Sequence, residues 1–310
     1  MDQLDRRAEL SEFLRTRRAR LQPQDVGLPS YGGRRRVPGL RREELAQLAG
    51  VSVAYYTRLE QGHGHNVSAG VLDAIAGALR LTRAERDHLT HLVKPKRRSA
   101  RRPAARRQRV RPGLQQLIDG MEHTPAYVVG RRLDVLAWNR LAGALLGNPA
   151  ALPPDERNMA WLVFLDPATR DLYTDWAQKA ADTVAWLRMD AGCHPDDPRL
   201  AALIGELSVK SPEFRRLWAA HHVQDKAYGT KELHHPLAGP LTLSYEALRL
   251  PADPGQELIV YHAEPGSTSA GALRWLAERD AEQPGVPAAP PAGPAAVPTA
   301  REAAPSVEPR

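Results

Sequence analysis

Apolar positions along the first part of the chain recur at the spacing of short amphipathic helices. The pattern predicts five such helices, over residues 5–21, 40–50, 53–61, 68–79 and 82–93. In the fourth helix Leu72, Ile75, Ala76 and Leu79 occupy positions i, i+3, i+4 and i+7, which line one helical face. Consecutive helices with no alternating segment between them predict an all-α domain.

Capping residues divide this region at the same places. Ser52 and Ser68 stand directly before apolar-periodic runs, where a serine hydroxyl can accept from free backbone N–H groups. Thr82 and Glu85 have the spacing of a capping box. Gly50 follows the second helix, where glycine commonly ends a helix.

The second and third helices are separated only by Gly50-Val51-Ser52, so they must cross at a steep angle. Small side chains at Ala46 and Ala49 let the two backbones approach each other. The shared apolar seam then consists of Leu45, Leu48, Val51, Tyr56 and Leu59. This arrangement turns the opposite face of the third helix outward.

Beyond residue 112 the periodicity becomes mixed. Short apolar runs at 126–129 and 133–138, split by a Gly-Arg-Arg turn, indicate a hairpin. Helical patterns dominate from residue 139 to 222, and strand-like segments return at 241–250 and 257–263. Strands, then helices, then strands predict one α+β domain with an antiparallel sheet.

Two stretches of biased composition flank this second domain. Residues 94–111 are poor in apolar side chains and rich in arginine, which is typical of a linker. The last residues are mostly Ala and Pro, which is typical of a disordered tail. We therefore expect a helical domain over residues 1–93, a basic linker over 94–111, an α+β domain over 112–280 and a tail over 281–310.

Charge is divided unevenly between these parts. Residues 1–111 contain 25 Lys and Arg against 11 Asp and Glu, whereas the remainder contains 18 basic and 25 acidic residues. A basic head on an acidic body indicates a polyanionic partner for the head alone. A solubilising charged face would give the same numbers, so charge needs support from a motif.

The outward face of the helix over residues 53–61 supplies such a motif. A helix presented in this way fits the major groove of double-stranded DNA, which is roughly 12 Å wide. Arg58 is the only long hydrogen-bond donor on this face, so it is our candidate for a bidentate contact with guanine. Val53 and Ala54 offer apolar contact, for example to a thymine methyl group, and Thr57 suits either kind of contact.

Side chains at the edges of the same helices suit phosphates better than bases. They are Arg41, Arg42, Ser52 and Tyr55. Phosphate contacts fix the position of a protein on DNA without reading its sequence. For Arg41 and Arg42 a purely solvated position is the alternative. The loop arginines 34–36 and the linker arginines could add further phosphate contacts. Each such contact makes the slope of the logarithm of the binding constant against the logarithm of the salt concentration more negative by about 0.9.

These helices resemble the helix-turn-helix of phage-repressor (Xre) regulators. The runs that carry the resemblance to MmyB-like transcription regulators in particular are Arg36-Val37-Pro38-Gly39-Leu40-Arg41-Arg42-Glu43-Glu44-Leu45-Ala46 and Tyr55-Tyr56-Thr57-Arg58-Leu59-Glu60-Gln61-Gly62. The resemblance covers residues 10–93 and implies that residues 53–61 form the recognition helix. The chain departs from the usual pattern at His63-Gly64-His65-Asn66, where the family has a shorter, more basic loop.

The second domain also resembles MmyB-like regulators. The runs that carry this resemblance include Trp138-Asn139, Asp175-Trp176, Leu187-Arg188, Ser211-Pro212-Glu213-Phe214, Leu217-Trp218 and His235-Pro236. They are similar to the family's ligand-binding domain, which implies a PAS-like fold and a small apolar ligand, for example a fatty-acyl one. The candidate ligand-binding residues are Trp138, Trp161, Phe164, Trp176, Trp186, Arg188, Phe214, Trp218, His221, His222 and Tyr245.

Two interpretations of these candidates stay open. The aromatic residues could fill a core as readily as they line a cavity. Arg188, His221 and His222 could anchor a ligand carboxylate, or they could form a structural ion pair with an acid such as Asp190 or Asp225.

Metal binding and catalysis find little support. The segments 194–197 and 234–235 carry His and Asp side chains, but a zinc site commonly needs several Cys or His ligands and Cys193 is the single thiol. The chain contains no nucleophile elbow, phosphate loop or dinucleotide fingerprint. We expect no enzyme activity, no metal and no cofactor.

The sequence thus predicts a transcription regulator that binds double-stranded DNA. The apolar runs are too short for a signal peptide or a membrane span, so we expect a cytoplasmic protein. By analogy with dimeric helix-turn-helix regulators, we expect a homodimer. Two alternatives remain, namely a ligand-independent repressor whose second domain only dimerises and an adaptor that binds other proteins through its helical head.

Overall fold

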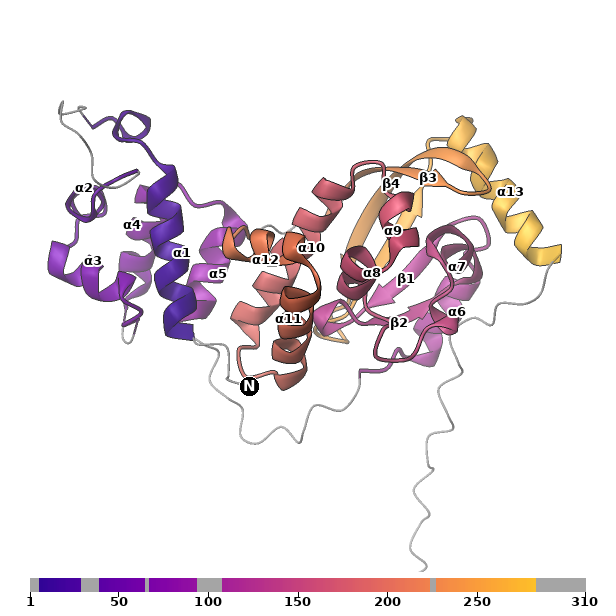
Figure 1. Cartoon of the computed structure of the whole chain (residues 1–310), viewed down its shortest axis with the longest axis horizontal. Helices are drawn as coiled ribbons and strands as arrows, with labels where there is room; N and C mark the ends of the chain where they lie inside the picture. The colour runs from indigo at the N-terminus through magenta and orange to yellow at the C-terminus, as the bar shows by residue number, and fades with distance from the viewer. Residues whose placement is uncertain (1–5, 29–38, 65–66, 94–107, 224–226, 283–310) are drawn as a thin grey trace, which may run out of the picture.

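A helical head and a mixed α/β body follow one another along the chain (Figure 1). The computed structural model describes residues 6–28, 39–64, 67–93, 108–223 and 227–282. We call residues 6–93 the head and residues 108–282 the body. In Figure 1 the head occupies one end of the molecule, and helices of the body lie between it and the sheet.

The head is built from the predicted helices. They are α1 (Arg6–Arg20), α2 (Arg42–Leu48), α3 (Val53–Glu60), α4 (Ala69–Ala78) and α5 (Arg83–Val93), with a short 3-10 helix η1 (Pro23–Val26) after α1. The predicted caps are confirmed, since the hydroxyl of Ser52 accepts from the backbone N–H of Tyr55 at 3.1 Å. Thr82 and Glu85 exchange both hydrogen bonds of a capping box.

The predicted seam between α2 and α3 is present. Leu45, Tyr56 and Leu59 are fully buried, and the small residues Ala46 and Ala49 are buried beside them. These side chains belong to one apolar core of the head, to which α1, α4 and α5 contribute as well.

A buried carboxylate joins three helices of the head. Oε2 of Glu60, at the end of α3, lies 2.8 Å from Nε of Arg18 on α1, and its Oε1 lies 2.8 Å from Nε of Arg42 on α2. Burial alone would raise the pKa of Glu60, but the hydrogen bonds and charge of Arg18 and the hydrogen bond from Arg42 hold it below its ordinary value. The carboxylate therefore stays charged at neutral pH.

Two glycines let loops cross the backbone of α1. Gly39 and Gly62 both have left-handed backbones, with φ of 78° and 86°. A Cβ atom would lie 2.5 Å from the carbonyl oxygen of Arg18 at Gly39, and 2.5 Å from that of Arg7 at Gly62. Only glycine satisfies both demands, so part of the motif around the second and third helices is structural.

The body combines a sheet with helices on both of its faces. Its elements in chain order are α6 (Pro112–Asp119), β1 (Ala126–Val129), η2 (Arg131–Leu133), β2 (Val135–Trp138), α7 (Arg140–Leu146), η3 (Pro149–Ala151), α8 (Met159–Leu165), α9 (Pro167–Leu172), α10 (Trp176–Cys193), α11 (Pro198–Lys210), α12 (Pro212–Ala219), β3 (Tyr228–His235), β4 (Gly239–Arg249), β5 (Glu257–His262) and α13 (Thr268–Glu282). The five strands have the order β2-β1-β5-β4-β3, and all neighbours are antiparallel.

Alternation along β1 separates the two faces of the sheet. Tyr127 and Val129 face the large core formed with α7, α8 and the helices that follow, whereas Ala126 and Val128 face a smaller core formed with α6. The buried side chain of Asn139 ties these layers together, because its amide donates to the carbonyls of Ile118, Met121 and Thr124.

The strands at 126–138, 241–250 and 257–263 are confirmed with small shifts of their ends. Strand β3 was not predicted from the sequence. This strand is an edge of the sheet and only Leu233 and His235 along it are buried, so it carries no clear apolar alternation. Most of the predicted linker, the arginines at 34–36 and the tail beyond residue 282 lie outside the described residues.

We predict that Glu60→Gln destabilises the head by about 3 kcal/mol, because it leaves the buried guanidinium of Arg18 without its counter-charge. Urea unfolding followed by circular dichroism measures this loss, with Glu43→Gln on the exposed face of α2 as control. A carboxylate whose pKa is lower in the folded than in the unfolded protein stabilises the fold at pH values above its unfolded-state pKa. This stabilisation is lost as the pH falls through the folded-state pKa. The difference between wild type and Glu60→Gln should therefore shrink in acid, and equal stabilities at pH 7 would contradict the prediction.

Candidate functional site

The free face of α3 carries the residues that sequence predicted to read DNA. Val53, Ala54 and Arg58 are exposed, with Val53 at 42%, and Thr57 is half-buried. The side chain of Arg58 forms no hydrogen bond or ion pair with another residue in the part of the chain that the structure describes. This face of α3 is therefore accessible, as predicted from the burial of Tyr56 and Leu59 on its opposite face.

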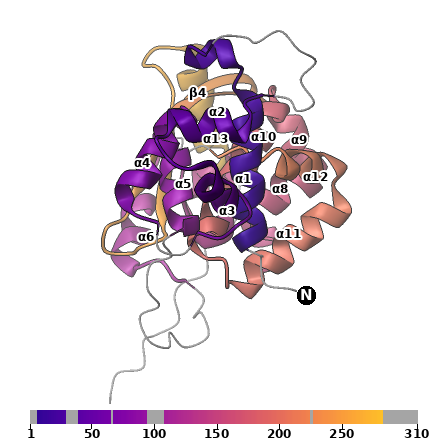
Figure 2. The same cartoon turned by 90° about the vertical axis from the view of Figure 1, so that its left-hand side faces the viewer.

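Helix α3 lies on the side of the head that faces away from the body. In Figure 1 it is at the outer end of the head, while α1 and α5 lie next to α10 and α12 of the body. Figure 2, which views the molecule from that end, shows α3 in front. The body, over its described residues 108–223 and 227–282, does not cover the predicted recognition face.

The four predicted phosphate contacts differ in their surroundings. Arg41 is exposed at the N-terminus of α2, and Ser52 is exposed while capping α3. Tyr55 is half-buried and packs partly on the head core. Arg42 binds Glu60 through Nε and keeps 48% of its side chain exposed, so at least part of its role is structural.

A cavity of about 100 Å³ lies in the body between the sheet and α10. Its sheet side is formed by neighbouring residues of three strands, because Tyr127 pairs with Ile259 and Ile259 pairs with Ala247. Helix α10 supplies Thr183 and Trp186 on the opposite side. We call this space the main cavity.

Charged groups also line the main cavity. Nζ of Lys231 lies 2.8 Å from a carboxylate oxygen of Asp182, and Lys179 and Glu257 also line the space. Lys179 lies over the ring of Tyr173, with its Nζ 5.0 Å from the ring centroid. The cavity thus offers both cationic and anionic groups next to an apolar floor.

Tyrosine hydroxyls supply most of the remaining polarity. Burial raises the pKa of Tyr245 to about 12 and holds the pKa values of Tyr127 and Tyr261 well above the ordinary value. All three line the main cavity and stay protonated at neutral pH. Tyr127 and Tyr261 share a hydrogen bond with each other, and the hydroxyl of Tyr245 can donate one to a bound molecule.

A second, smaller cavity of about 20 Å³ shares Tyr127 and Met159 with the main one. It is mostly apolar, and Trp138 and Tyr173 also line it. The indole nitrogen of Trp138 is buried without a hydrogen-bond partner among the residues described. A space of this size holds about one water molecule.

The predicted ligand residues fall into separate groups. Trp186 and Tyr245 line the main cavity, and Trp138 lines the small one. Phe164, Trp176, Phe214 and Trp218 pack against one another in the helical layer, where Phe164 lies at 5.1 Å from Phe214 between ring centroids. Trp161 is half-buried on α8 and lines neither cavity.

Arg188, His221 and His222 lie at the boundary between head and body and line neither cavity. Arg188 forms an ion pair with Glu9 of α1. The open choice between a carboxylate anchor and a structural ion pair therefore goes to the ion pair, although its acid is Glu9 and not Asp190. Asp225 lies outside the described residues.

Sequence analysis did not single out several residues of the main cavity, including Lys179, Asp182 and Tyr127. Tyr127 sits in a strand predicted correctly, and its position facing the larger core follows from alternation along β1. Lys179 and Asp182 look like surface residues of a polar helix face. No local signal distinguishes them, because their role depends on where α10 meets the sheet.

Several motif residues hold the fold of the body. The ring of His235 accepts from the backbone N–H groups of Leu237 and Ala238 through Nδ1, and its Nε2 lies 3.0 Å from the carbonyl oxygen of Ala144. Nδ1 therefore holds the turn after β3, and Nε2 links this turn to α7. His194 contacts Asp190 at 2.8 Å, and among the described residues no group of three or more His, Cys, Asp or Glu could hold a metal ion.

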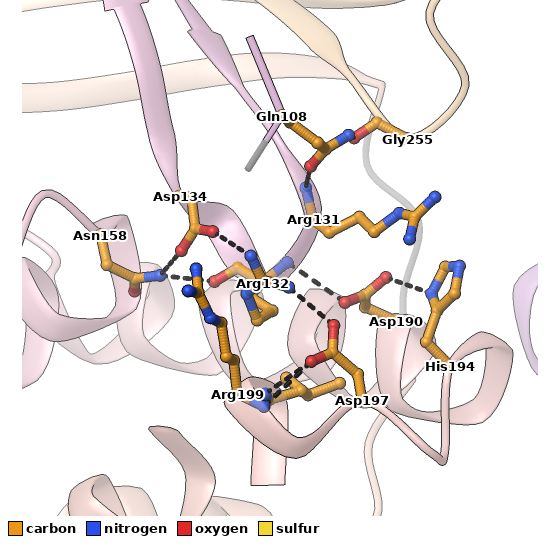
Figure 3. A network of polar contacts seen from close by, with 11 residues as sticks. Gln108, Arg131, Arg132, Asp134, Asn158, Asp190, His194, Asp197, Arg199 and Gly255 are labelled. Carbon is orange, nitrogen blue, oxygen red and sulfur yellow. Dashed lines mark hydrogen bonds and ion pairs between the residues drawn. The ribbon is translucent and has the colours of Figure 1, made fainter. Parts of the chain in front are cut away.

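A strained connection borders the main cavity. Arg132 and Leu133, in the segment between β1 and β2, have left-handed backbones with φ of 60° and 64°. Figure 3 shows the polar network that holds this segment, in which the backbone N–H of Arg132 donates to Asp190 of α10 and its guanidinium binds Asp134 and Asp197. Leu133 itself lines the main cavity.

Comparison with known families agrees with this architecture. Residues 9–89 match a helix-turn-helix domain. Residues 110–276 match the MmyB-like transcription regulator ligand binding domain. No curated protein matches the chain.

These matches define the protein first as a helix-turn-helix DNA-binding protein with a separate ligand-binding domain. The second match covers more than half of the chain, so the chain belongs to the MmyB-like transcription regulators. It is a transcription regulator and not an enzyme. No helix in the described part of the chain is long and apolar enough to span a membrane.

Proposed function

We propose that this regulator binds a specific operator through α3 and that a small, largely apolar ligand in the main cavity changes this binding. The observation that supports it most directly is the pairing of an uncovered α3 face with a cavity in the matched ligand-binding domain. Because its operator lies on the chromosome, we expect the regulator in the cytoplasm.

The chemistry of the α3 face supports sequence-specific recognition. Arg58 is exposed and long enough for two hydrogen bonds to one guanine. Val53 and Ala54 add apolar contacts in the groove, and Thr57 adds either kind. Arg41, Ser52, Tyr55 and the free part of Arg42 surround this face and would hold phosphates.

The size and lining of the main cavity restrict the ligand. A cavity of about 100 Å³ is comparable to the engineered apolar cavity of about 150 Å³ that holds benzene. The fatty-acyl ligand suggested by resemblance would therefore have a short chain. Its apolar part would lie on Ile259 and Val129, and its carboxylate would lie near Lys179 and Lys231.

The presence of a cavity favours this proposal over a ligand-independent repressor. A body that served only for dimerisation would have no need of a space lined by lysines and protonated tyrosines. The cavity thus offers a ligand an apolar surface together with hydrogen-bonding groups.

We predict that Arg58→Ala removes the preference for one base in each half of the operator and weakens binding by about 1–3 kcal/mol. Selection of binding sites from a random DNA library, followed by titration of the best site, measures both effects. Arg86→Ala, at a half-buried arginine of α5 that pairs with Asp73, serves as control and should select the wild-type site. An unchanged base preference in Arg58→Ala would contradict the assignment.

We also predict a homodimer on DNA. Two α3 helices that read successive major grooves must lie about 34 Å apart, which requires two heads and an operator with approximate twofold symmetry. Light scattering after size-exclusion chromatography gives the mass of the complex. A single chain on the selected operator would overturn this part of the proposal.

We predict that short saturated fatty acids bind the main cavity and quench Trp186 fluorescence, with affinity falling from octanoate to tetradecanoate. Ala247→Leu fills part of the cavity and should weaken octanoate binding by about tenfold or more, since it removes space and overpacks the site. Leu248→Phe, at the next and exposed residue of β4, is the matched control. Equal binding by wild type and Ala247→Leu would place the ligand elsewhere.

A further inference from the structure

Helix α10 is shared by the main cavity and the head. Asp182, Thr183 and Trp186 line the cavity. Met189 packs on the apolar core of the head. Near the end of α10, Gly192 lies so close to His88 of α5 that a Cβ atom would be 2.6 Å from its Nδ1.

One uninterrupted helix, α10, spans the distance between the main cavity and the head. At 1.5 Å per residue, Asp182 and Gly192 are about 15 Å apart along the helix. An uninterrupted helix shifts or tilts as a unit, so a displacement at the cavity reaches the head without a flexible joint in between.

A buried group of charges closes the contact between α10 and the head. Arg188 is 0% exposed, it forms an ion pair with Glu9 of α1, and its Nη1 lies 2.9 Å from Nδ1 of His221. Nε2 of His88 on α5 lies 3.8 Å from the same Glu9 carboxylate. We call Glu9, His88, Arg188 and His221 the joint cluster.

Further contacts surround the joint cluster. Arg17 of α1 binds Glu85 of α5, with its Nε 2.8 Å from the carboxylate, and it also donates to the carbonyl oxygen of His221. Arg20 lies 2.8 Å from Nδ1 of His222. The short segment after α12 is therefore held by both α1 and α10.

Burial alone would raise the pKa of Glu9, but the nearby imidazoles of His221 and His88 and the charge of Arg188 hold it well below the ordinary value. The carboxylate is thus ionised at neutral pH, and moving the head means moving ion pairs. Such pairs depend steeply on geometry and contribute little net stability compared with apolar packing.

The joint cluster is also incompletely satisfied. Nδ1 of His88, Nε of Arg188 and Nη1 of Arg17 have no hydrogen-bond partner among the described residues. A permanent interface would be expected to pair or remove these buried groups. The unpaired groups weaken the contact between α10 and the head, because a buried polar group without a partner is costly.

A second contact connects α10 with the lining of the main cavity. Asp190 accepts from the backbone N–H of Arg132, and the neighbouring Leu133 lines the main cavity. Arg132 and Leu133 have left-handed backbones, and such backbones persist only where the surrounding structure holds them. Here the polar network of Figure 3 holds the segment. An occupant that touches Leu133 therefore acts on α10 through Asp190 as well as directly through Trp186.

We propose that α10 is a lever that couples occupancy of the main cavity to the position of the head, and that the joint cluster is the contact through which the lever acts. This inference rests on the proposed function, in that it takes the main cavity as the effector site. An occupant shifts α10 against the sheet, and the joint cluster either follows with the head or breaks.

Amide hydrogen exchange of the full-length protein tests the lever without a ligand. Ala247→Leu places extra volume in the cavity from β4, outside α10 and outside the head. We expect it to change exchange rates in α1 and α5 by about fivefold or more, in the range usual for coupled sites. Leu248→Phe, on the exposed side of the same strand, should leave these rates unchanged.

Removing the joint should disconnect the two parts. In a Glu9→Gln background we expect Ala247→Leu to have no effect on exchange in α1 and α5. Glu12→Gln is the matched control, because Glu12 lies on the same helix and pairs with the exposed Arg15. If Glu9→Gln does not fold, His221→Asn replaces it, since asparagine tolerates the left-handed backbone of that position (φ 52°).

Two outcomes overturn the lever. One is unchanged exchange in the head when Ala247→Leu fills the cavity, and the other is the same response with and without the joint cluster. Octanoate binding that leaves head exchange unaltered would refute the lever while the proposed ligand stands. A head response to Ala247→Leu without any fatty-acid binding would refute the ligand class and leave the lever intact.

Discussion

The buried guanidinium of Arg188 is the constraint on which the arrangement of head and body depends. A charge with no exposure to water must find its counter-charge inside the protein, and here that counter-charge comes from Glu9, far away in the sequence. Meeting this requirement brings α1 against α10. The same requirement orients the head so that α3 lies on the far side, away from the body.

The head repeats this principle on a smaller scale. Glu60 serves Arg18 and Arg42 in the way that Glu9 serves Arg188, so a single carboxylate fixes the angles between α1, α2 and α3. The apolar core supplies most of the stabilisation, but apolar packing tolerates sliding. The ion pairs and the two glycines beside α1 select one arrangement among those that the core would accept.

Sequence predicted the head almost completely because its information is local. Caps at Ser52 and Thr82 and the seam around Tyr56 can be recognised within a few residues of one another. The body was predicted in class but not in detail. Strand β3 escaped because an edge strand buries few side chains, and the main cavity escaped because Tyr127, Lys179 and Ala247 come together only after the sheet and α10 are assembled. The pair of Glu9 and Arg188 is invisible in the sequence for the same reason.

The sparse chemistry of the α3 face has a consequence for how this regulator finds its sites in a genome. With one long donor among Val53, Ala54, Thr57 and Arg58, each half-site would specify few positions strongly, and one wrong base costs about 1–3 kcal/mol. Discrimination against the background of the chromosome must then be shared between two half-sites, their spacing and the deformability of the DNA between them. Such a regulator would tolerate considerable variation in the base sequence of each half-site but little variation in the spacing between half-sites.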